Sequence, residues 1–212
     1  MKLLSVGLAR ALWFMDVNEL NPGGKDVFTH LFPAMLEDYK FRTSPTPADD
    51  PGQGLKFLQG EYVKQDGTVI LVNVTVFNDG IAADTFSSTT DSEDFLSEAL
   101  SSLPEVGFAY EPEMVRRKAY VSQLNVKCSK PLHTLNPKLV EFATKVSSAV
   151  GTRFDMAAIE LWPDQSLALK PANFSFQRKS GEPAESERYW SQAALPTDKH
   201  LELLRDLEAL LA

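Results

Sequence analysis

Hydrophobic and polar residues alternate along the first part of the chain, which is the pattern of a β-strand. We predict this strand over residues 3–15, before a break at the Asn21-Pro22-Gly23-Gly24 segment. From residue 25 the apolar period lengthens to that of a helix, and the stripe continues to residue 39. Pro33 lies inside this stripe, so it must either kink the helix or mark its first turn.

Three strands and a helix complete the first half. Asp66-Gly67 and Asn78-Asp79-Gly80 separate the strands and are typical of tight hairpins, because these residues tolerate a positive φ. In the middle strand the even-numbered residues from 70 to 76 are apolar, so we expect one buried face and one partly polar face. The predicted strands are 55–63, 68–77 and 81–86, and a helix over 90–103 is predicted to be capped by Thr90, with Glu93 at the capping-box spacing.

The second half contains elements of the same kinds. A strand over 118–128 precedes a helix with Asn136 as its N-cap, Pro137 at its first position and Gly151 after its end. We expect the apolar stripe of this helix, which includes Leu139 and Phe142, to be buried. The remaining elements are predicted strands over 154–162, 167–177 and 187–194, and a last helix from Thr197 with leucines 203, 204, 207, 210 and 211 on its inner side.

The element order β-α-β-β-β-α therefore occurs twice, over residues 1–110 and 111–212. We predict an α+β protein with antiparallel sheets, helices on one face and an internal duplication, whose two units could be fused into one continuous domain. In element order alone, this pattern resembles the TATA-binding protein family, whose saddle-shaped fold joins two sheets into one curved surface. No motif of that family is present in the sequence, so no functional residue is carried over. Two unrelated α+β pieces are the alternative.

Charge and cysteine content restrict the partners. The chain has a net charge of −8, with −9 on residues 1–110 and +1 on residues 111–212. This sign disfavours nucleic-acid binding. No stretch approaches the apolar length of a membrane span. Cys128 is the only cysteine, so an intrachain disulfide and a cysteine-based zinc site are excluded, and we expect a cytoplasmic protein.

The sequence contains no catalytic or metal-binding motif that we recognise, and we predict no cofactor. His30, His133 and His200 are not at metal-ligand spacing, and we interpret them as surface residues. Cys128 could form a nucleophilic pair with His133, but its place in the strand alternation favours a buried, inert thiol. Asp84 is a candidate for a perturbed acid, although the solvent face of its strand is the simpler interpretation.

Five residues are candidates for binding a partner. Arg116 and Arg117 begin the densest basic cluster of the chain. Trp162, Tyr189 and Trp190 belong to the last predicted sheet, where the adjacent Tyr189 and Trp190 must point to opposite faces. An aromatic residue on the open face would indicate a binding surface.

These observations favour a non-catalytic protein that binds another protein, or a second copy of itself, through the open face or edge of its sheet. An inhibitor or immunity-type protein that neutralises a basic partner with its acidic half is the first alternative. The second is an enzyme or ligand-binding protein with a cleft around Asp84, Glu160 and Trp162.

Overall fold

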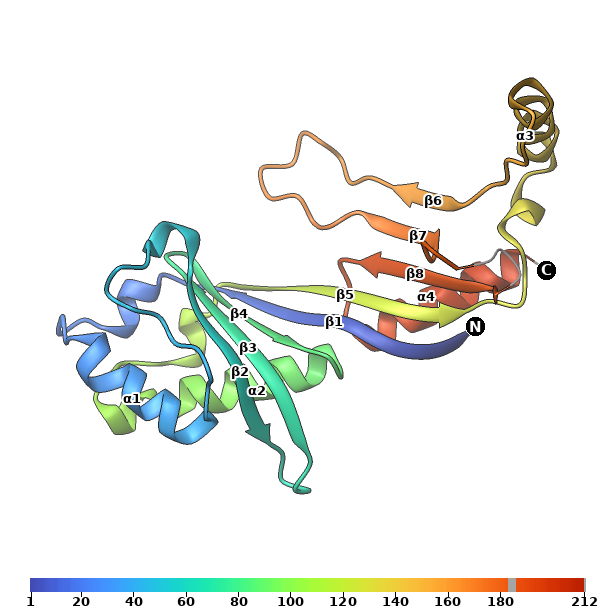
Figure 1. The fold of residues 1–212 in the computed structure, drawn as a ribbon. Coiled ribbons are helices and arrows are strands. Elements are labelled where there is room, and N and C mark those ends of the chain that lie inside the picture. Colours follow the sequence, from blue (N-terminus) through green and yellow to red (C-terminus); the bar gives the residue numbers. More distant parts are fainter. Residues whose placement is uncertain (183–185, 212) are drawn as a thin grey trace. The chain divides into compact units, whose positions relative to one another are not determined.

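The protein has a mixed α+β fold. A computed structural model describes residues 1–182 and 186–211, and in that part of the chain it contains four α-helices and an eight-stranded antiparallel sheet (Figure 1). The predicted α+β class is therefore confirmed. The strand order is β2-β3-β4-β1-β5-β8-β7-β6. The strands are β1 (Lys2–Phe14), β2 (Leu55–Val63), β3 (Val69–Phe77), β4 (Gly80–Thr85), β5 (Arg117–Lys127), β6 (Ala158–Leu161), β7 (Phe174–Arg178) and β8 (Arg188–Ala193), and the helices are α1 (Val27–Tyr39), α2 (Thr89–Ser101), α3 (Pro137–Val150) and α4 (Thr197–Leu210).

The chain divides into two compact units. The first unit is Leu8–Val121, and the second unit combines Met1–Gly7 with Ser122–Ala212. This division differs from the predicted 1–110 and 111–212 because the long strands β1 and β5 each contribute residues to both units.

Hairpins form the sheet of the first unit as the turn residues predicted. Ile70, Val72 and Val74 are buried on one face of β3. Asn73 points to the other face, where its side-chain oxygen accepts the backbone N–H of Gln59 at 2.8 Å. Gln59 has a φ of +57° and lies where the register between β2 and β3 shifts, so the Asn73 side chain supplies a partner to a backbone amide at this bulge.

Helices α1 and α2 belong to the core that covers one face of this sheet. Asp26 caps α1, and Pro33 lies inside the helix instead of in its first turn. The predicted cap of α2 is wrong. Ser88, not Thr90, accepts the N–H of Asp91 at 3.0 Å, and α2 begins at the next residue, Thr89. Ser88 satisfies the free amide of the first turn because it lies three residues before Asp91.

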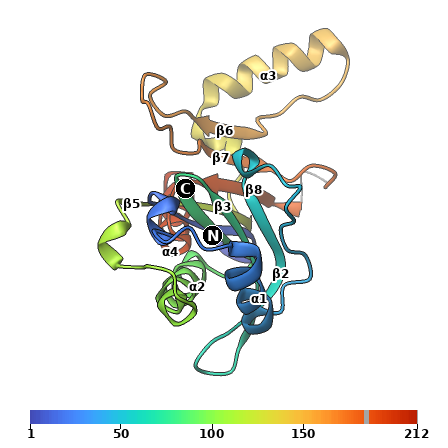
Figure 2. The same ribbon diagram turned by 90° about the vertical axis from the view of Figure 1, so that its left-hand side faces the viewer.

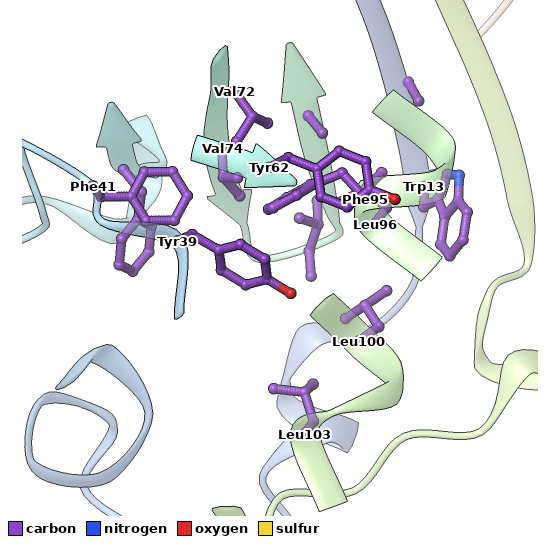
Figure 3. Packing of buried hydrophobic residues seen from close by; sticks show 14 of the residues in the cluster. Trp13, Tyr39, Phe41, Tyr62, Val72, Val74, Phe95, Leu96, Leu100 and Leu103 are labelled. Atoms are coloured by element: carbon purple, nitrogen blue, oxygen red, sulfur yellow. The ribbon is translucent and has the colours of Figure 1, made fainter. Parts of the chain in front are cut away.

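Aromatic side chains make up much of the core of the first unit (Figure 3). Tyr39 of α1 meets Phe95 of α2 edge to face, with ring centroids 4.9 Å apart, and Phe95 also meets Tyr62 of β2 at 5.7 Å. Phe32 of α1 packs in the same way on Phe57 of β2 at 4.9 Å. These contacts fix both helices to the sheet, because edge-to-face pairs add to the hydrophobic contribution of burial.

The second unit has a smaller core, in which α4 packs on the sheet (Figure 2). Leu124, Val126 and Phe176 from the strands are fully buried together with Leu204 of α4. Only some of the leucines that we predicted on the inner side of α4 are buried. His200 is buried beside Leu204, whereas Leu203 and Leu210 are exposed.

Two strands of the second unit are shorter than predicted. The strand predicted over 154–162 begins only at Ala158, and the strand predicted over 167–177 begins only at Phe174. Residues 167–173 form no regular element. Pro171 has no amide hydrogen to donate to a neighbouring strand, which explains why pairing starts after it.

Candidate functional site

Helix α3 forms where the sequence predicted it. The Asn136 side chain accepts the N–H of Lys138 at 3.0 Å, and Pro137 occupies the first turn. Gly151 ends the helix with a φ of +79°, and its N–H donates to the carbonyl of Ser147. Each of these features stabilises a helix end without help from the rest of the protein.

The apolar side of α3 is covered only in part. All residues of α3 are described, and none is buried. Leu139, Phe142 and Val150 share one side of the helix, and the Phe142 side chain is 63% exposed. The prediction that this stripe is buried is therefore wrong, because an amphipathic sequence indicates an apolar side but not what covers it.

Only a few contacts connect α3 to the rest of the second unit. The Ser147 hydroxyl accepts the backbone N–H of Phe154 at 2.7 Å, and Ala143 and Val146 are half-buried. In both ribbon views α3 lies beyond β6, on the side away from α4 (Figures 1 and 2). The helix thus leaves Leu139, Phe142 and Val150 of its apolar side exposed.

Strand β6 is the last strand of the sheet in the described part of the chain. Ile159 faces the same side as buried Phe176, its partner in register on β7. Leu161 has the same parity as Ile159 but is 61% exposed, and Ile159 is only half-buried. The α4 face of β6 therefore carries apolar side chains that α4 leaves partly uncovered.

Three aromatic candidates from the sequence lie in different environments. Trp162, directly after β6, is 66% exposed. Tyr189 and Trp190 point to opposite faces of β8, as predicted from their adjacency. Tyr189 is buried and stacks on Phe176 with ring centroids 4.5 Å apart, so its ring is not available to a partner. Trp190 is half-buried on the other face.

The two basic candidates lie in the first unit, at the start of β5. Arg116 forms an ion pair with Glu19, with Nη2 and Oε1 3.0 Å apart. The guanidinium of Arg117 lies over the ring of Phe14, 5.4 Å from its centroid. Both side chains already have a partner within the unit, which reduces what they can offer to another molecule.

The acidic candidates also have local partners. Both oxygens of Asp84 accept hydrogen bonds from the Arg10 guanidinium, at 2.6 and 2.7 Å. Glu160 accepts longer hydrogen bonds from Asn173 and Ser175, each at 3.4 Å. Asp84 belongs to the first unit and Glu160 to the second, and each carboxylate is engaged inside its own unit.

Cys128 lines a pocket of about 210 Å³ in the second unit. Burial raises the pKa of this thiol, and its Sγ donates to the carbonyl of Lys130 at 3.3 Å. A raised pKa lowers the fraction of reactive thiolate, so the structure favours the inert thiol over the pair with His133. The pocket carries charges of both signs and is lined by Cys128, Pro131, His133, Arg153, Asp155, Arg178, Glu187 and Tyr189.

His200 is not a surface residue, and its interpretation from the sequence was wrong. The ring is fully buried, with Nδ1 2.8 Å from the Ser122 hydroxyl and Nε2 2.9 Å from the Ser191 hydroxyl. Burial lowers the pKa of His200 to about 4. No local pattern indicates these two serines, which come from different strands.

Comparison with known proteins gives no further indication. No protein-family model matches the chain, and no curated protein matches it.

Among the described residues, no group of three or more histidine, cysteine, aspartate or glutamate side chains could hold a metal ion. No helix in the described ranges is long and apolar enough to cross a lipid bilayer.

Proposed function

We propose that the protein is a non-catalytic assembly protein that binds a second copy of itself through α3 and β6. The observation that carries this proposal is the exposed apolar side of α3, with Leu139, Phe142 and Val150. A well-capped helix with such a side usually packs on another surface, because exposed apolar area is costly in water. A cytoplasmic location, in keeping with the single free thiol of Cys128, is part of the proposal.

The choice of a second copy rests on two surfaces that the chain leaves uncovered. One is the apolar side of α3, and the other is the α4 face of β6, with Leu161 and half-buried Ile159. We propose that α3 of each copy packs on β6 and β7 of the other. A two-fold exchange of this kind covers both surfaces at once and closes the assembly as a dimer.

The first unit supports this arrangement by comparison. We propose that the two halves of the sequence, 1–110 and 111–212, arose by duplication. Both halves follow the order β-α-β-β-β-α, and the strands of each half come in the same order when the sheet is read inward from its two ends. Under this hypothesis α1 corresponds to α3. Helix α1 buries Phe32 and Tyr39 against its own sheet, whereas α3 buries no residue in its own chain.

Charge separates this proposal from the inhibitor alternative. The polar side of α3 carries Lys138, Glu141 and Lys145, which have mixed signs. An α3 contact should therefore depend little on salt, whereas a contact that uses the acidic residues of the first half should weaken steeply as ionic strength rises.

Sedimentation analysis across a range of chain concentrations tests the proposal. We expect wild type to dimerise and Phe142→Glu to remain monomeric with an unchanged circular dichroism spectrum. Phe86→Glu is the matched control, because Phe86 is also exposed (56%) but lies in the first unit. A wild-type chain that stays monomeric up to about 100 µM contradicts the proposal. Its dimer affinity would then be weaker than a specific interface of ordinary size requires.

Disulfide trapping tests the geometry. In a Cys128→Ser background, a chain with Phe142→Cys is mixed with a chain that has Leu161→Cys, and oxidation should link the two chains. A double variant that instead closes the bond within one chain shows that α3 folds onto its own sheet, and the proposed exchange is then wrong.

A further inference from the structure

The core of the first unit contains an apolar cavity of about 140 Å³. It lies between α1, α2 and the sheet, and α1 contributes Leu31 and Met35, β3 contributes Val74, and α2 contributes Ala99. Asn21 is the one polar residue among those that line it.

The Asn21 side chain already makes two hydrogen bonds to the backbone of Lys25. Its side-chain nitrogen donates to the carbonyl of Lys25, and its side-chain oxygen accepts the N–H of Lys25, both at 2.9 Å. A buried water needs two to four polar partners, which the remaining apolar lining does not offer. The cavity is therefore suited to a molecule without hydrogen-bonding groups.

Aromatic contacts of α1 lie next to this cavity. Phe32 and Tyr39 fix the helix by edge-to-face contacts with Phe57 and Phe95, each at 4.9 Å. The residues of α1 near these contacts, including Leu31 and Met35, are only half-buried. Leu31 and Met35 line the cavity beside these contacts.

We propose that this cavity binds an uncharged hydrocarbon group of about the size of benzene, either a single aromatic ring or a short alkyl group. The size is the basis for this class, since an apolar cavity of about 150 Å³ in another protein stays dry and binds benzene or xenon. The site lies wholly within the first unit and does not depend on α3 or β6.

Methyl NMR titration with benzene tests the site directly. We expect saturable chemical-shift changes at Leu31, Val74 and Ala99, and a rise in melting temperature of roughly 2 °C as the ligand approaches saturation. Xenon should shift the same methyl signals. A wild-type protein that shows no saturable change up to the solubility of benzene overturns the proposal, whatever the variants do.

Two variants of α2 locate the bound ligand. Ala99→Leu extends a lining side chain into the cavity and should abolish the benzene-dependent shifts at Leu31 and Val74. Ser97→Leu adds the same side chain at an exposed position of α2 and should leave binding unchanged. Binding that persists in folded Ala99→Leu would place the ligand elsewhere and contradict the proposal. Dimerisation through α3 is measured separately by sedimentation, so either proposal can fail alone.

Discussion

The hydroxyl oxygen of Ser122 lies 2.8 Å from Nδ1 of His200, and the hydroxyl of Ser191 lies 2.9 Å from Nε2 of the same ring. The two serines also contact the backbone carbonyls of Leu195 and Ser175. A neutral imidazole has one N–H donor, so it donates to one serine and accepts from the other. The serine that donates to the ring uses its single hydroxyl hydrogen there, so only the other serine can donate to its backbone carbonyl at the same time. Both nitrogens of this buried ring thus have partners, which avoids the cost of burying them unpaired.

This arrangement predicts that acid destabilises the fold. Burial lowers the pKa of His200 to about 4, so the folded protein binds this proton less readily than the unfolded chain, whose histidine titrates near 6.5. The contribution of His200 to stability is complete above about pH 6.5 and declines as the pH falls toward 4, by up to about 3 kcal/mol. Urea unfolding at successive pH values measures this decline.

His200→Gln removes the titrating group and keeps hydrogen-bonding capacity. We expect its free energy of unfolding to change less between pH 6.5 and 4 than that of wild type. His30→Gln, at an exposed position, should keep the wild-type pH dependence. If the free energy of unfolding falls with pH equally in His200→Gln and wild type, another group is responsible for the decline.

The exposure of α3 predicts that its apolar residues contribute little to the stability of a single chain. Phe142→Ala should change the free energy of unfolding by less than about 0.5 kcal/mol when measured on the dilute monomer. Phe95→Ala removes a fully buried ring of the first unit and should cost about 3 to 5 kcal/mol. Equal losses in the two variants would show that the Phe142 ring is buried in the monomer.

Local signals predicted most of the elements. Asp66-Gly67 and the Asn78-Asp79-Gly80 turn correctly separate the three strands of the first unit, and Asn136 with Gly151 correctly bounds α3. These features act within a few residues, so the sequence is sufficient to find them.

Features that depend on distant residues were missed. The burial of His200 needs Ser122 and Ser191, which are separated from it by 78 and 9 residues. The α3 stripe has the same amphipathic pattern whether its own sheet or another molecule covers it. Of the aromatic candidates, Trp162 is exposed and Tyr189 is buried, a difference set by the position of α4 and not by local sequence.

The ion pair between Arg10 and Asp84 should contribute measurably to stability. Its two hydrogen bonds join neighbouring strands at 2.6 and 2.7 Å, and the Asp84 side chain is only 16% exposed. We expect Asp84→Asn to lower the free energy of unfolding by about 1 kcal/mol, since Arg10 is partly solvated and screening reduces the effect. A double-mutant cycle with Arg10→Gln isolates the pair.

Glu202→Gln is the control for this pair. Glu202 and Lys199 lie 2.9 Å apart, but both side chains are more than half exposed. The loss of unfolding free energy in Glu202→Gln should be close to zero. A coupling energy near zero for Arg10 and Asp84 as well would mean that their paired geometry does not stabilise the fold.

Cys128 should behave as a buried structural thiol. Burial raises its pKa, so a thiol reagent such as Ellman's reagent should react slowly with the folded protein and quickly in urea. Cys128→Ser should cost about 1 to 2 kcal/mol, because a hydroxyl is buried less favourably than a thiol, and should leave dimerisation unchanged. Ser129→Cys in that background places a thiol at the adjacent exposed position and should react at once. Rapid reaction of Cys128 in the folded protein would contradict the inert thiol and reopen its pairing with His133.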